Sequence, residues 1–151
     1  MERSKAHTLE TTSVSSRTFP ADRTAPRAAA AWLRSQPTGL SAARLADAEL
    51  CMDELVTNVV RYGWPASHEE HRALTVRIDR SETEVEISVE DAGAAFDPTA
   101  ATVAPIARSL DEAVPGGRGL MLVRAIAPRV VYERRNGVNR TTIAFPMQTV
   151  T

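Results

Sequence analysis

The sequence of 151 residues contains one cysteine, Cys51, so no disulfide can form within the chain. Its 18 basic and 19 acidic residues nearly cancel, and a formal net charge of −1 gives no overall signature of nucleic-acid binding. No stretch reaches the roughly 18 consecutive apolar residues that a membrane-spanning helix needs. The polar start, Met1 to Glu10, lacks the apolar region of a secretory signal. We therefore expect a cytoplasmic protein that contacts neither nucleic acid directly nor a membrane.

What is present suits one soluble globular domain. Hydrophobic residues make up 43% of the chain, which is enough to build one core at this length. We expect residues 1–10 to form a flexible N-terminus and residues 11–148 to form a single domain. Internal repeats and low-complexity tracts are absent from the sequence, so a repeat architecture is excluded.

The order of predicted elements indicates an α+β fold. Apolar residues at helical spacing predict helices, and period-two alternation predicts half-buried strands. In chain order we expect a strand within Leu9–Phe19, helices over Arg27–Ser35 (with Asp22 as N-cap) and between Ser41 and Gly63, a hairpin of strands around Leu74–Asp79 and Glu84–Glu90, a helix over Gly119–Ala127, and a hairpin of Val130–Arg135 and Thr141–Phe145. Helices on one face of a mainly antiparallel sheet form a two-layer sandwich.

The second predicted helix contains the segment Asp53-Glu-Leu-Val-Thr-Asn58. Glu54 and Asn58 are four residues apart, so they share one face of the helix. The carbonyl oxygen of Asn58 can ligate magnesium, which prefers oxygen ligands. Glu54 can accept a proton or orient a nucleophile. The alternative is that both side chains simply point to solvent, as charged helical residues usually do.

A predicted strand runs directly into Asp91-Ala-Gly93. A carboxylate at the end of a strand can accept a hydrogen bond from an exocyclic amine such as that of adenine. The glycine lets the backbone approach a flat ligand closely. Because Asp and Gly are also turn residues, the same segment alone is equally well explained as a turn that ends the strand.

Glycines surround the start of the third predicted helix, in Gly116-Gly117-Arg118-Gly119-Leu120. Such a start exposes backbone N–H groups and the positive end of the helix dipole, which suits phosphate. Arg118 can add charge-assisted hydrogen bonds. Taken alone, the loop is as consistent with a flexible linker. We interpret Arg134 and Arg135 as residues on the solvent-exposed edge of a strand; the alternative is a phosphate-binding patch.

The three segments, in this order, resemble the histidine-kinase-like (GHKL) ATPase superfamily over roughly Leu45 to Phe145. The resemblance is closest to the anti-sigma factor serine/threonine kinases of bacterial partner-switching systems. It implies the Bergerat ATP-binding fold, with ATP and Mg²⁺ as cofactors. Two positions depart from the family pattern: Ala95 stands where a second glycine is common, and Arg140 stands where a glycine often precedes the threonine pair.

The resemblance also implies roles for individual residues. Glu54 matches the catalytic base, Asn58 the magnesium ligand and Asp91 the adenine-binding aspartate. The remaining ATP-binding positions are Gly93 beside the base, the phosphate loop of Gly117, Arg118, Gly119 and Leu120, and Thr141 near the adenine site. Residues Asp97 to Pro115 correspond to a lid over the nucleotide.

The function that the resemblance implies is that of an anti-sigma factor that is also a kinase. It would bind a sigma factor, phosphorylate a serine or threonine of a STAS-type antagonist protein, and form a homodimer. Two alternatives remain open from the sequence: a non-catalytic binding module that uses ATP to order its lid, and a simple ATP hydrolase.

Overall fold

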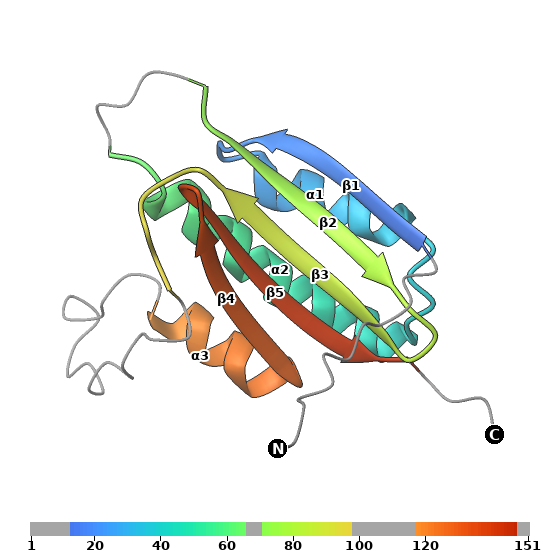
Figure 1. Ribbon diagram of the computed structural model, residues 1–151. Coiled ribbons are helices and arrows are strands. Elements are labelled where there is room, and N and C mark those ends of the chain that lie inside the picture. The colour runs from blue at the N-terminus through green and yellow to red at the C-terminus, as the bar shows by residue number, and fades with distance from the viewer. Residues whose placement is uncertain (1–12, 66–70, 98–116, 148–151) are drawn as a thin grey trace, which may run out of the picture.

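The computed structural model describes residues 13–65, 71–97 and 117–147 (Figure 1). Its elements, in chain order, are β1 (Ser13–Pro20), α1 (Ala25–Ser35), α2 (Ala42–Tyr62), β2 (Ala73–Arg80), β3 (Glu84–Asp91), α3 (Gly117–Ile126), β4 (Arg129–Arg135) and β5 (Val138–Pro146). The predicted lid, apart from Asp97, lies outside these ranges.

The five strands form one sheet in the order β1-β2-β3-β5-β4, and every neighbouring pair is antiparallel. All three helices lie on the same face of this sheet (Figure 1). The predicted two-layer α+β sandwich is therefore confirmed. The register of β3 and β5 places Asp91 directly opposite Asn139.

Strand alternation builds the core, because every second residue of β2, β3 and β5 points towards the helices. These inward residues are almost completely buried: Leu74, Val76, Ile78, Val85, Ile87, Val89, Ile143 and Phe145. Helix α2 supplies the opposing layer with a stripe that includes Cys51, Met52, Leu55 and Val56. The buried stripe of α2 contains one polar residue, Asn58.

Local signals fix the ends of the elements. The Ser41 side chain accepts a hydrogen bond from the Arg44 N–H at 3.2 Å, so Ser41 caps α2. The prediction that Asp22 caps α1 is wrong. Its carboxylate accepts from the Thr24 N–H instead, and α1 begins after Thr24, with Pro26 in its first turn.

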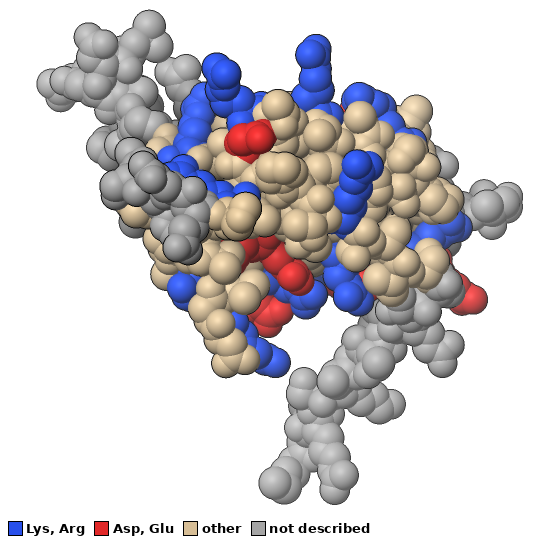
Figure 2. Space-filling view, turned by 90° about the horizontal axis from the view of Figure 1, so that it is seen from above, with Lys and Arg blue, Asp and Glu red and all other residues tan. Residues whose placement is uncertain are grey.

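The other face of the sheet carries charged residues in ion pairs. Arg129 reaches Glu84 and Glu86 across the sheet, and Arg140 reaches Glu90. On the face shown in Figure 2, basic side chains are spread among uncharged ones, with acidic side chains beside several of them. Within the described ranges, no helix combines the length and apolar character needed to cross a membrane.

Candidate nucleotide site

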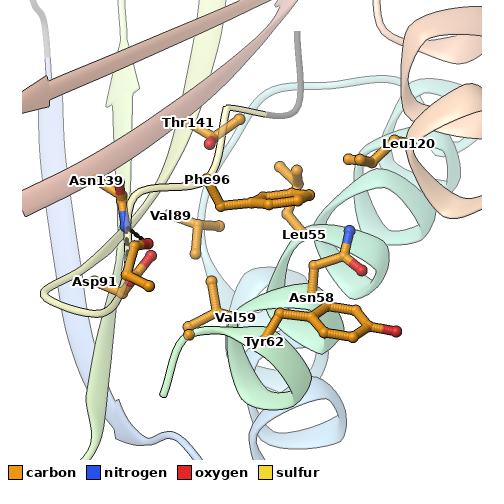
Figure 3. Close-up of a pocket in the computed structure, with 12 residues that line it drawn as sticks. Leu55, Asn58, Val59, Tyr62, Val89, Asp91, Phe96, Leu120, Asn139 and Thr141 are labelled. Carbon is orange, nitrogen blue, oxygen red and sulfur yellow. Dashed lines mark hydrogen bonds between the residues drawn. The ribbon is translucent and has the colours of Figure 1, made fainter. Parts of the chain in front are cut away.

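A pocket lies where the C-terminal half of α2 meets the ends of β3 and β5 (Figure 3). Four of the predicted site residues line this pocket, each from a different element: Asn58, Asp91, Leu120 and Thr141. The complete lining is Leu55, Asn58, Val59, Tyr62, Gly63, Val89, Asp91, Ala94, Phe96, Leu120, Asn139 and Thr141. The fold thus brings together Asn58 and Thr141, which are 83 positions apart in the sequence.

The carboxylate of Asp91 is buried at the end of β3 and is held through one oxygen. Its Oδ1 accepts hydrogen bonds from the Gly93 N–H at 2.9 Å and from Asn139 Nδ2 at 3.1 Å. Among the residues that the structure describes, Oδ2 has no hydrogen-bond partner. One oxygen is therefore fixed by the protein, and the other remains as an acceptor for a ligand.

The turn after Asp91 is fastened to the end of α2. Ala94 donates its N–H to the carbonyl oxygen of Gly63 at 2.7 Å, and Gly63 follows the last residue of α2. The backbones are so close that a Cβ on Gly93 would lie 2.2 Å from that oxygen. Gly93 is therefore required for this contact, which joins two residues of the pocket lining, Gly63 and Ala94.

Asn58 points into the pocket from α2 (Figure 3). It is 7% exposed, yet its Nδ2 has no hydrogen-bond partner in the described part of the chain. A buried polar group without a partner costs about 1–3 kcal/mol, so native proteins keep few of them. A bound group that satisfies the amide would remove this cost. A carboxamide in this position fits both a nucleotide and, through its oxygen, a magnesium ion.

Glu54 lies one helical turn before Asn58 and is half-buried. It is not among the residues that line the pocket. No hydrogen bond or ion pair engages its carboxylate within the described ranges. The carboxylate of Glu54 affects a neighbouring group. The pKa of the Cys51 thiol is raised to about 11, mainly by burial and further by the charges of Asp47 and Glu54.

The walls of the pocket are apolar. Leu55 and Val59 come from α2, Val89 from β3 and Leu120 from α3, and the Phe96 ring projects into the space between them (Figure 3). Phe96 is 42% exposed although it is large and apolar. Apolar walls around a few fixed polar groups are typical of sites for flat cofactors.

Helix α3 begins at Gly117, two residues before the predicted start. The segment 117–119 therefore forms its first turn, and Leu120 in the same turn lines the pocket. The positive end of the α3 dipole is thus beside the pocket, as phosphate binding requires. The side chain of Arg118 lies outside the described part of the structure.

Sequence reasoning missed Asn139 and Tyr62 as lining residues. A signal for Asn139 exists, because Thr141 faces inward and residues two apart on a strand share a face.

Arg134 is also more than an edge residue: it donates to the carbonyl oxygen of Gly93 at 3.1 Å and to Asn139 Oδ1 at 2.8 Å. Arg140 points to the opposite face, where it pairs with Glu90, so it leaves Thr141 in the pocket.

Comparisons with known proteins show which family the chain resembles. Residues 19–145 match the family model described as Histidine kinase-like ATPase domain. A stretch of 94 residues is 44% identical to the Serine/threonine-protein kinase BtrW of Bordetella bronchiseptica, covering 62% of this chain and 65% of that protein. The solved structure of the RsbU and RsbW domains of Rv1364c from Mycobacterium tuberculosis is similar with a TM-score of 0.57 at 20% identity, covering 93% of this chain and 35% of that chain.

The structural similarity confirms the fold, and the family match extends over most of the chain. The predicted resemblance to histidine-kinase-like ATPases, and to the serine/threonine kinases among them, is confirmed. On the evidence of the match over residues 19–145, the chain belongs to the histidine kinase-like ATPase domain family.

Proposed function

We propose that this chain binds ATP with magnesium in the pocket and acts as a protein-serine/threonine kinase on a STAS-type antagonist of a sigma factor. The observation that carries the nucleotide assignment is the Asp91 carboxylate, fixed through Oδ1 and open at Oδ2 at the end of an apolar pocket. The kinase assignment is supported by the 44% identity to a protein named as a serine/threonine kinase.

Separate groups of the chain would bind the adenine base, the phosphates and the magnesium ion. The free Oδ2 of Asp91 would accept a hydrogen bond from the adenine amine, and Thr141 would lie beside the base. The N-terminal turn of α3, residues 117–119, would present its N–H groups to the phosphates. Asn58 would hold magnesium, which neutralises charge on the transferred phosphoryl group when it is bound.

In the transfer step that we propose, the hydroxyl oxygen of the acceptor serine or threonine forms a bond to the γ-phosphorus. The bond between that phosphorus and the β–γ bridging oxygen breaks, and ADP leaves. Glu54 accepts the hydroxyl proton. Its position one turn from Asn58 and its lack of ion pairs within the described ranges support this role.

The regulatory part of the proposal follows from the motif resemblance. The same chain, as a homodimer, would hold a sigma factor, and phosphorylation of the antagonist would decide which of the two partners is bound. The relative BtrW is matched over 65% of its length, so partners and activity of the whole protein are part of this proposal.

The test is transfer of labelled phosphate from ATP to STAS-domain proteins of the same genome. Glu54→Ala should lower the transfer rate by about 10²–10⁴-fold while ATP still binds, because a general base contributes roughly that much. Asp53→Ala is the matched control, since it removes the neighbouring half-buried carboxylate of α2, and it should transfer at nearly the wild-type rate.

Equal transfer by both variants would remove Glu54 from the mechanism. Wild-type protein that binds ATP but labels no antagonist would instead support the non-catalytic binding module. Release of labelled phosphate to water without an acceptor would support the ATP hydrolase.

A further inference from the structure

The carboxamide of Asn139 uses its complete hydrogen-bonding capacity inside the protein. Its Nδ2 donates to Asp91 Oδ1 at 3.1 Å and to the carbonyl oxygen of Ala94 at 2.8 Å. Its Oδ1 accepts from the Tyr132 hydroxyl at 2.5 Å and from Arg134 at 2.8 Å. A primary amide has two donor hydrogens and two acceptor lone pairs, and Asn139 is 4% exposed. All four positions are therefore occupied by the chain itself.

These partners allow only one orientation of the amide. If it were reversed, its oxygen would face the acceptors Asp91 Oδ1 and Ala94 O, and its NH₂ group would face the Arg134 guanidinium. Both contacts would be repulsive. The donor side of Asn139 is thus directed at Asp91, and the neighbouring charge of Arg134 polarises the amide and strengthens that donation.

We propose that Asn139 is a positioning residue that makes the pocket select a 6-amino purine over a 6-oxo purine. This inference rests on the proposed binding of ATP. The Gly93 N–H and Asn139 together hold Asp91 Oδ1, so the carboxylate cannot rotate to exchange the positions of Oδ1 and Oδ2. Oδ2 remains as a fixed acceptor, which pairs with an amine and repels a carbonyl oxygen at the same place.

Without Asn139, one donor would remain on Asp91 Oδ1, the N–H of Gly93. The carboxylate could then rotate about its χ2 bond, so Oδ2 would no longer be held in one orientation towards the ligand. The turn at Ala94 would also lose the hydrogen bond to its carbonyl oxygen. ATP should lose affinity under these conditions, while the 6-oxo nucleotide should lose little because it gains little from the aligned Oδ2.

The test is calorimetric titration of ATP and inosine triphosphate, each with magnesium, into wild type and two variants. Asn139→Asp keeps the shape and the acceptors but removes both donors, and Asn139→Ala removes the group altogether. The wild type should prefer ATP, and both variants should reduce the ratio of the two affinities by about tenfold. Two variants are used because a second buried carboxylate beside Asp91 can impair folding.

Thr142→Val is the matched control. It also removes a side-chain hydrogen bond between β3 and β5, the 2.9 Å contact of Thr142 with Ser88, but it does so on the opposite face of the sheet. Its affinity ratio should stay within about twofold of the wild type, because the lost hydrogen bond lies on the face of the sheet away from the pocket and affects both nucleotides equally.

A ratio within twofold of the wild type in a folded Asn139 variant overturns the inference, and so does an equal fall in Thr142→Val. A purely structural role for Asn139 would weaken both nucleotides together and leave the ratio unchanged. Wild-type protein that binds neither nucleotide overturns the proposed function and this inference with it, whereas normal ATP binding with an unchanged ratio overturns the inference alone.

Discussion

Gly93→Ala is the substitution whose effect the structure determines most sharply. The added Cβ would lie 2.2 Å from the carbonyl oxygen of Gly63, 2.8 Å from its carbonyl carbon and 2.9 Å from Asp91 Oδ1. The first two atoms are backbone at the end of α2, so no side chain can move aside to relieve the contact. The turn and the helix end must separate by roughly 1 Å to restore van der Waals contact.

That separation has two costs. It breaks the 2.7 Å hydrogen bond from Ala94 N–H to Gly63 O, which contributes about 1 kcal/mol. Overpacking of a well-packed contact costs a further 1–3 kcal/mol or so. We therefore expect Gly93→Ala to lower the free energy of unfolding by about 2–4 kcal/mol. Because Asp91 moves with the turn, ATP affinity should fall at least tenfold or so.

Urea unfolding of the wild type, Gly93→Ala and Gly137→Ala measures these terms. Gly137 lies in the β4–β5 turn at φ +78°, and a Cβ there would meet nothing within 4 Å. Its substitution should cost only the left-handed backbone strain, about 1–2 kcal/mol, and should leave ATP binding unchanged. If Gly93→Ala is no less stable than Gly137→Ala and binds ATP as the wild type does, the close contact between the turn and the end of α2 does not hold the pocket in shape.

Three further predictions concern single side chains. Asn58→Leu should raise stability by about 1–2 kcal/mol in urea unfolding, because it removes a buried Nδ2 without a described partner, yet it should abolish magnesium-dependent ATP binding. Burial raises the pKa of the Cys51 thiol to about 11, so the folded state holds this proton more tightly than the unfolded state does. The free energy of unfolding should therefore be unaffected by this group below about pH 9 and should fall by up to about 3 kcal/mol as the pH rises through 11. In unfolding measured as a function of pH, Cys51→Ala should lack this loss. Arg140→Ala should cost less than about 1 kcal/mol in thermal unfolding and leave the affinity for ATP unchanged, since its ion pairs lie on the solvent face; a large loss of ATP affinity would contradict that placement.

Elements with strong local signals were predictable from the sequence. Helix α2 is long and has the Ser41 cap at its start and Gly63 after its end, so its observed bounds follow from the pattern. The turn Asn136-Gly137 has positive φ at both residues, as a tight hairpin between β4 and β5 requires. These signals are local, and they survive in the folded chain because the tertiary contacts agree with them.

The parts that were not predictable depend on contacts between distant segments. The cap of α1 is wrong by two residues because Asp22 and Thr24 are both good capping residues and the sequence does not rank them. The role of Asn139 depends on the register of β3 and β5 and on the turn at Ala94, 45 residues away. The two-residue spacing from Thr141 indicates only that Asn139 faces inward. Neither that spacing nor the residue type predicts that Asn139 holds Asp91.

The central claim is that ATP binds with its adenine at Asp91, and isothermal titration of Asp91→Asn tests it most directly. Gly93 N–H and Asn139 Nδ2 would keep the new amide oxygen where Oδ1 lies. The NH₂ group would then face the adenine amine, donor against donor. We predict a five- to hundredfold loss of affinity, from about 1–3 kcal/mol for one unmet hydrogen bond. Asp47→Asn, which removes the same charge from the exposed side of α2, should bind like the wild type. Equal ATP affinity in Asp91→Asn and the wild type would contradict the account.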